Sequence, residues 1–189
     1  MIRSPELMSR EDSLLLVVDV QEKLLPAIGE AKRIEWNIRR LIDGAKLLGV
    51  PLIATEQYPQ GLGATVSSLR ERIEHRPAKK TFSCAGCEKG MEGIVAAGRA
   101  KILVVGIETH VCVQQTALDL VAAGYRVYLA VDAIGSRAAL DHDTALRRLE
   151  AAGLTLTTTE SALFEWCATA AAPEFKSISA LVKESPPAS

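Results

Sequence analysis

The chain has 189 residues, with 22 Lys and Arg against 23 Asp and Glu, so its formal net charge is −1. Hydrophobic residues make up 48% and charged residues 24%, which is typical of a globular domain and excludes a disordered or collagen-like chain. No basic run is longer than three residues, so the chain has no field that would hold nucleic acid or an anionic membrane. We therefore expect neither of these partners.

The apolar segments are too short for a membrane span, because none approaches the roughly 20 residues that a spanning helix needs. The run 14–18 is also too short for a signal peptide, and Glu11 and Asp12 precede it where a signal would be basic. We expect a cytoplasmic protein whose four cysteines are thiols, since a chain of this length needs no disulfide framework.

In chain order, the first predicted element is a strand, the continuous apolar run 14–19. Apolar residues at helical spacing then predict a helix over 31–48, which Gly49 ends. A second strand is expected at 51–55, and a short one near 78–82.

The second half repeats this alternation. A strand at 101–107 precedes a helix at 110–123, and a strand at 126–132 precedes a helix at 143–152. The elements predicted after them are a strand over 154–158 and a helix over 173–184. Glycines at four joints between a helix and a strand are typical of helix ends that need a left-handed residue: Gly49, Gly98, Gly124 and Gly153.

Alternating strands and helices predict crossover connections and a parallel sheet. The strands are apolar throughout, as expected when helices cover both faces of the sheet. We predict an α/β fold: a single doubly wound, three-layer α/β/α domain over 1–189, with its ordered core at about 12–183. Its six parallel strands are expected in the order 3-2-1-4-5-6.

Functional groups of such sheets gather beyond the carboxyl ends of the strands. Asp19 follows the first strand there, either as a turn or capping residue or as a general base in a partly desolvated cleft. Cys112 starts a predicted helix, either as a small buried apolar residue or as a thiol whose ionisation the helix dipole favours.

Lys79 and Lys80 are adjacent, so alternation along a strand sends them to opposite faces. If Phe82 is buried, Lys80 shares its face and Lys79 points the other way. The alternative is that both lysines are solvated, which is the usual environment of a lysine pair.

Cys84 and Cys87 have the C-x-x-C spacing of thiol redox motifs, which alone is a weak signal. No proline lies between Pro77 and Pro173 to face this motif, as the thioredoxin pattern requires. A zinc site would need two further ligands, and Cys167 and the three histidines are scattered without ligand spacing.

Four segments together resemble the isochorismatase-like cysteine hydrolases, and the similarity covers nearly the whole chain. These segments are LVVDVQ (16–21), KKTFS (79–83), VGIETHVC (105–112) and QTALD (115–119). Two others, TEQYPQGLG (55–63) and PEFK (173–176), look most like the isochorismatase-domain-containing subgroup, whose physiological substrate is not assigned.

The resemblance implies a catalytic triad of Asp19, Lys79 and Cys112. It also implies a cis peptide bond between Ile107 and Glu108, which would aim the backbone N–H groups of Glu108 and Cys112 at a developing oxyanion. Further residues are expected to line the substrate pocket: Gln21, Glu56, Gln57, Tyr58, Phe82 and His110.

The implied chemistry is hydrolysis of a small amide or related C–N bond through a thioester on Cys112. Isochorismate cleavage itself is an enol-ether hydrolysis that needs no cysteine nucleophile. Nicotinamidases of this family carry an Asp-x-His metal site after the second strand, whereas this chain has Glu56, Gln57 and Tyr58, without histidine. We therefore expect no metal and no cofactor.

Two alternatives stay open: a thiol redox or sensor protein that uses Cys84 and Cys87, and a non-catalytic scaffold of the same fold. Members of the family commonly assemble, so a homo-oligomer, a dimer or larger, is expected alongside a small-molecule substrate.

Overall fold

The computed structural model describes residues 3–187 and contains one six-stranded sheet. All neighbouring strands are parallel, and their order is β3-β2-β1-β4-β5-β6, which confirms the predicted fold class and strand order. The strands are β1 (Ser13–Val18), β2 (Leu52–Gln57), β3 (Ala78–Lys79), β4 (Lys101–Ile107), β5 (Arg126–Gly135) and β6 (Thr155–Thr157).

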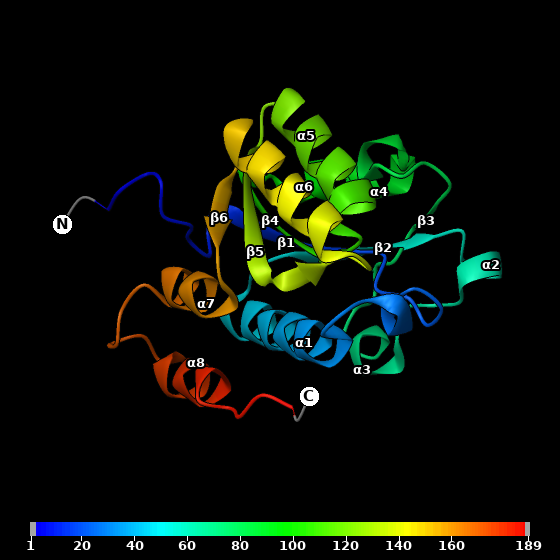
Figure 1. Cartoon of the computed structure of the whole chain (residues 1–189). Coiled ribbons are helices and arrows are strands. Elements are labelled where there is room, and N and C mark those ends of the chain that lie inside the picture. Colours follow the sequence, from blue (N-terminus) through cyan, green and yellow to red (C-terminus); the bar gives the residue numbers. More distant parts are fainter. Residues whose placement is uncertain (1–2, 188–189) are drawn as a thin grey trace.

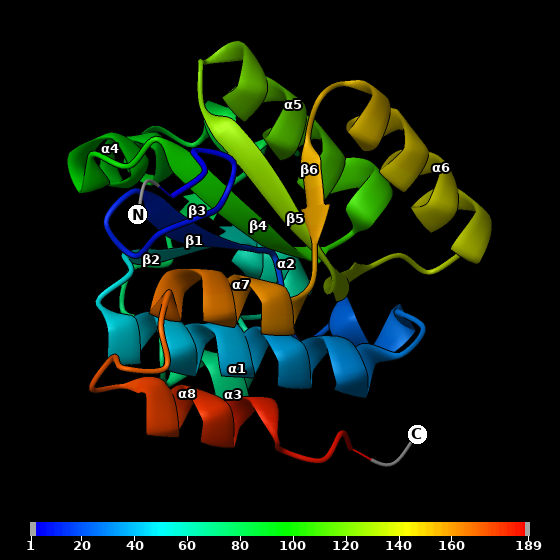
Figure 2. The same cartoon turned by 90° about the vertical axis from the view of Figure 1, so that its left-hand side faces the viewer.

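Helices cover both faces of this sheet (Figures 1 and 2). One face carries α1 (Ala31–Leu48) and α7 (Thr159–Cys167), with α3 (Ser67–Arg70) and α8 (Phe175–Val182) packed outside them. The other face carries α4 (Glu88–Ala97), α5 (Gln114–Ala122) and α6 (Ala139–Ala151). Shorter elements are α2 (Pro59–Leu62), the 3-10 turns η1 (Leu25–Ala27) and η2 (Cys84–Gly86), and the π-helical turn η3 (Thr109–Val113).

Burial explains why the central strands are apolar along their whole length. Every residue of β1 and β4 is buried, since a helix layer lies on each face. None of the helices in the described part of the chain is both long and apolar enough to cross a membrane.

The glycine joints behave as predicted. Each has a positive φ: 71° at Gly49, 62° at Gly98, 91° at Gly124 and 89° at Gly153. A residue with a side chain is disfavoured in this conformation, so these glycines end their helices where the next strand must begin.

The segment after β3 departs from its predicted extended form. The strand ends at Lys79, and Phe82 is 53% exposed, so the premise that Phe82 is buried is wrong. Lys79 is nevertheless only 4% exposed while Lys80 is exposed, so the two lysines do point apart. The chain bends because the Lys79 ammonium donates to the carbonyl oxygens of Thr81 and Phe82, at 3.2 and 2.8 Å.

Gly106 in β4 tolerates no side chain. Its φ is +119°, and a Cβ there would lie 2.1 Å from the carbonyl oxygen of Val18 in β1. We expect Gly106→Ala to lower the free energy of unfolding by more than about 3 kcal/mol, because strain and a backbone clash add. The matched control is Gly98→Ala, which has positive φ but open space, and should cost about 1–2 kcal/mol. Equal losses in urea unfolding would contradict the clash.

Candidate active site

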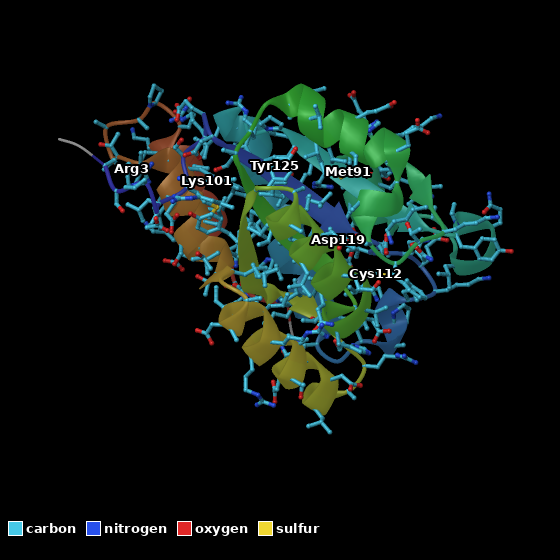
Figure 3. The ribbon with its side chains drawn as sticks, turned by 90° about the horizontal axis from the view of Figure 1, so that it is seen from above. Arg3, Met91, Lys101, Cys112, Asp119 and Tyr125 are labelled. Carbon is cyan, nitrogen blue, oxygen red and sulfur yellow. The ribbon has the colours of Figure 1, made fainter. Side chains whose placement is uncertain are left out.

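The sheet brings Asp19, Lys79 and Cys112 to one edge, from three strands that are far apart in sequence. Asp19 follows β1, Lys79 ends β3, and Cys112 lies in η3 directly after β4. Figure 3 shows Cys112 at the end of the sheet opposite Lys101, where β4 begins. Parallel strands place their carboxyl ends together, which is why three distant residues meet here.

Asp19 and Lys79 form a buried ion pair. Lys79 Nζ donates to Asp19 Oδ2 at 2.6 Å, and both side chains are 0% exposed. Thr55 Oγ1 donates to the other oxygen, Asp19 Oδ1, at 2.8 Å. The negative charge of the same carboxylate acts on the Cys112 thiol. The Asp19 carboxylate therefore binds the ammonium and a strand β2 hydroxyl, and it lies near the thiol.

All N–H donors of the Lys79 ammonium have acceptors within the protein. Besides Asp19 Oδ2 it has three acceptors, Gln57 Oε1 at 2.9 Å and the carbonyl oxygens of Thr81 and Phe82. Three N–H groups face four acceptors, so none is left for a substrate. Lys79 consequently has no free N–H group to donate to a bound molecule.

Cys112 rests as a neutral thiol. Burial raises its pKa, the negative charge of Asp19 raises it further, and the positive charge of Lys79 offsets only part of this. The thiol is 6% exposed and sits in the π-helical turn before α5. The sequence-based idea that a helix dipole makes this thiol ionise easily is therefore not supported.

This raised pKa predicts how Cys112 is alkylated as the pH changes. Only the thiolate reacts, and a raised pKa moves thiolate formation to higher pH, so the iodoacetamide rate should still climb above pH 9. A cysteine in a short peptide with blocked ends, with a thiol pKa of about 8.5, should level off in the same range. Peptide mapping by mass spectrometry separates Cys112 from the other cysteines. A plateau below pH 8 would show that the thiol is activated in the resting protein.

The peptide bond between Ile107 and Glu108 is cis, at the bond that the resemblance indicated. The Glu108 carbonyl oxygen accepts from the N–H groups of Val111 and Val113, at 3.1 and 3.2 Å, and so begins the π-helical turn. The Glu108 carboxylate accepts from Arg137 N and Nε, both at 3.1 Å. The side chain is thus bound by Arg137, while the role of the backbone N–H groups as an oxyanion hole stays a prediction.

Three of the residues predicted to line the pocket have hydrogen bonds inside the protein, and their contact with a substrate stays a prediction. Gln21 donates to the carbonyl oxygens of Gln57 and Gly63 and accepts from Gln57 N, with no exposed surface. Glu56 Oε1 accepts from Thr65 N and Oγ1, at 2.8 and 2.7 Å. Gln57 Oε1 accepts from Lys79 Nζ, and Gln57 Nε2 donates to the Lys80 carbonyl oxygen. All three secure the loop around the ion pair.

The other three predicted residues are accessible. Tyr58 is 49% exposed and Phe82 53%, and their backbones flank Lys79, since Tyr58 N donates to the Lys79 carbonyl. The His110 side chain is 24% exposed, and a 3.0 Å hydrogen bond joins its Nδ1 to Ser136 Oγ. These three side chains are available to a substrate.

Cys84 belongs to the network of the ion pair. Its Sγ lies 3.4 Å from Thr55 Oγ1, and its N–H donates to Thr116 Oγ1, one helical turn after Cys112. Burial, followed by the charge of Asp19, raises its pKa to about 11. Cys87 instead donates to the Ala78 carbonyl at 3.6 Å, and both cysteines are free thiols.

Sequence reasoning did not identify the supporting roles of Thr55, Gln57 and Arg137. The only available signal was Thr55, a polar residue near the end of β2. Because β2 pairs with β1, Thr55 lies beside the end of β1, where Asp19 follows. Across residues 3–187, no group of three or more His, Cys, Asp or Glu side chains is placed to hold a metal ion.

Comparison with known proteins supports the resemblance. A family model described as the isochorismatase domain matches residues 13–161. Isochorismatase domain-containing protein 1 of Danio rerio is 37% identical over 187 residues, which cover 96% of this chain and 65% of that protein. The chain thus spans less than two thirds of that relative's length.

Two solved structures have the same fold. One, described as the MAR1 ribonuclease of Caenorhabditis elegans, is 38% identical with a TM-score of 0.88, and the match covers 96% of this chain and 94% of the other. The ycaC gene product of Escherichia coli, described as an octameric hydrolase of unknown specificity, is 24% identical with a TM-score of 0.84 over 89% and 86% of the two chains. At that identity the second match shows the fold alone.

Proposed function

This chain belongs to the isochorismatase family, and we propose that it is a metal-independent cysteine hydrolase that cleaves a small amide or related C–N bond. One observation carries this proposal: Asp19 binds the Lys79 ammonium at 2.6 Å, and its negative charge acts on the Cys112 thiol, in a buried site at the carboxyl edge of the sheet. A nucleophile held against a base, with that base held by a third group, is the arrangement that covalent catalysis requires.

In the first half-reaction Asp19 takes the thiol proton as the Cys112 sulfur attacks the carbonyl carbon. The new C–S bond pushes an electron pair onto the carbonyl oxygen, and the backbone N–H groups of Glu108 and Cys112 are proposed to stabilise that oxyanion. Collapse breaks the C–N bond, and Asp19 passes its proton to the departing nitrogen. The product of this step is a thioester on Cys112 and a free amine or ammonia.

In the second half-reaction Asp19 takes a proton from water, whose oxygen attacks the thioester. Collapse breaks the C–S bond and releases a carboxylic acid, and the sulfur regains a proton from Asp19. The N–H groups of Lys79 remain hydrogen-bonded to the protein throughout. Tyr58, Phe82 and His110 are proposed to contact the substrate.

The test is a panel of small amides and ureides, read by ammonia release after treatment with EDTA. The proposal expects at least one substrate and an acyl adduct on the peptide that contains Cys112, found by mass spectrometry after acid quench. Turnover that EDTA abolishes and zinc or manganese restores would contradict metal independence. Turnover with an adduct on another residue would contradict the nucleophile.

A ribonuclease activity, which the name of the nematode relative states for that protein, is not favoured for this chain. The formal charge is −1 and no long basic run is available to contact phosphates. The redox alternative is also weaker, because Cys84 and Cys87 bond to different partners. A reversible Cys84–Cys87 disulfide after mild oxidation would revive it.

The proposal includes a cytoplasmic location, supported by four free cysteines, and a homo-oligomer. The octameric state described for the Escherichia coli neighbour makes assembly of this chain a reasonable expectation. Light scattering coupled to size-exclusion chromatography would contradict it by giving a mass near 20.3 kDa.

A further inference from the structure

A cavity that is not lined by Asp19, Lys79 or Cys112 opens at the carboxyl end of β5. It has a volume of about 280 Å³. Its walls come from the segment that enters α1, the end of β5 and the start of α6: Gly29, Glu30, Arg33, Ile34, Val131, Ile134, Gly135, Ser136, Arg137, Ala139 and His142. We propose that this cavity binds a small organic carboxylate with a short aliphatic body.

The apolar part of the lining suits an aliphatic body. Ile34 and Ile134 are buried, and Val131 and Ala139 complete an apolar wall. A cavity of this size admits a small metabolite but not a drug-sized molecule. An aliphatic chain of a few carbons would displace water from these side chains and gain the hydrophobic term.

The charged part of the lining suits a carboxylate. Arg33 and Arg137 contribute two positive charges, and Glu30, which pairs with Arg33, contributes one negative charge. Arg137 uses its N and Nε for Glu108, while its Nη1 and Nη2 have no partner within residues 3–187. Two adjacent guanidinium N–H groups are the donors that a carboxylate accepts best. Burial lowers the pKa of His142, so the imidazole is neutral near pH 7. Glu30 and Glu108 balance the charges of the two arginines, so recognition of a carboxylate depends on the free Nη1 and Nη2 donors of Arg137.

The cavity also contacts the segment that carries the nucleophile. Ser136 Oγ is bonded to His110 Nδ1, and His142 Nδ1 is bonded to Thr109 Oγ1, each at 3.0 Å. Thr109 and His110 lie in η3 with Cys112. A ligand that contacts Ser136 or His142 would therefore change the environment of η3 without contacting the thiol.

The probe is sodium butyrate, titrated into the ¹⁵N-labelled full chain and followed by amide NMR shifts. Sodium acetate has the carboxylate without the body, and n-butanol has the body without the charge. We expect saturable shifts of Ser136, Arg137 and His142 with butyrate, followed by Thr109 and His110. Acetate and n-butanol should each bind about tenfold more weakly, since each lacks one of the two recognised groups.

Gly29 offers a way to fill the cavity. Its φ is not in the left-handed range, and a Cβ there meets no atom within 4 Å. Gly29→Leu adds a bulky side chain to the lining and should weaken butyrate binding at least tenfold, while Gly29→Ala should leave it within about twofold. Arg33→Gln should weaken it about fivefold, and Arg147→Gln, on the far part of α6, should not.

Circular dichroism of Gly29→Leu would verify that the variant folds, and Arg33→Gln gives an independent result if it does not. The proposal is overturned if butyrate gives no saturable shifts up to about 100 mM, a concentration well above the millimolar range expected of weak ligands. It is equally overturned if n-butanol binds as well as butyrate, or if Arg33→Gln and Arg147→Gln behave alike.

Discussion

Replacing Cys112 by alanine is expected to lower kcat/KM for any amide substrate by about 10⁴-fold or more, the loss seen when a covalent nucleophile is removed. The sulfur atom makes the bond to the acyl group, and no other described side chain at this edge replaces it: Cys84 is 0% exposed, and its pKa of about 11 keeps it protonated. The measurement is ammonia release with the substrate found in the panel, beside thermal unfolding of the same sample.

Cys167→Ala is the matched control, because Cys167 is a buried free cysteine in α7, away from the site. It should lose stability to a similar degree and keep its turnover. If Cys112→Ala retains more than about one tenth of the activity, the proposed mechanism is wrong. Loss of activity in both variants would instead point to damage of the fold.

Replacing Lys79 by methionine is expected to lower the free energy of unfolding by about 3–5 kcal/mol and to abolish turnover. The change leaves the Asp19 carboxylate buried at 0% exposure without its counter-charge, and a single unpaired buried charge is strongly unfavourable. Chemical denaturation in urea measures the loss of stability. Activity should fall because Asp19 loses both its charge partner and its position.

Lys101→Met serves as the control in this second experiment. Lys101 is also buried, at the start of β4 (Figure 3), and its Nζ donates to the Leu7 carbonyl at 2.6 Å and lies 2.9 Å from Asp12 Oδ2. The Asp12 side chain is 34% exposed, so water can solvate its charge once the ammonium is gone. The free energy of unfolding of Lys101→Met should therefore fall by only about 1–2 kcal/mol, and turnover should be kept.

The double variant Asp19→Asn with Lys79→Met should be more stable than Lys79→Met alone, because it removes the orphaned charge. If the loss of unfolding free energy in the double variant equals the sum of the losses in the two single variants, the two side chains are not coupled as the 2.6 Å contact indicates.

Most of the elements could be predicted from the sequence because their signals are local. The apolar run of β4 and the helical spacing of α1 predicted their bounds as found, at Lys101–Ile107 and Ala31–Leu48. Errors arose where tertiary contacts override local pattern. Residues 80–82 leave the sheet because the Lys79 ammonium draws two carbonyl oxygens toward itself, and no periodicity records that.

The candidate site was predictable as motifs but not as a network. Asp19, Lys79 and Cys112 stood out by motif, whereas the bonds of Gln21 and Glu56 within the protein depend on which loops lie side by side. Their amide and carboxylate groups resemble substrate-binding groups in the sequence. In the folded chain they satisfy backbone groups of the 57–65 segment, as buried polar atoms generally do.

The sequence by itself determined the alternation of strands and helices and the glycines that end the helices, because each depends on neighbours a few positions apart. Only the tertiary structure decided that Cys112 rests as a protonated thiol, that every Lys79 N–H group has an acceptor in the protein, and that a cavity lies beside η3. Desolvation and charge depend on distances between segments of the chain that are remote in sequence, and these distances exist only once the strands have taken their order in the sheet.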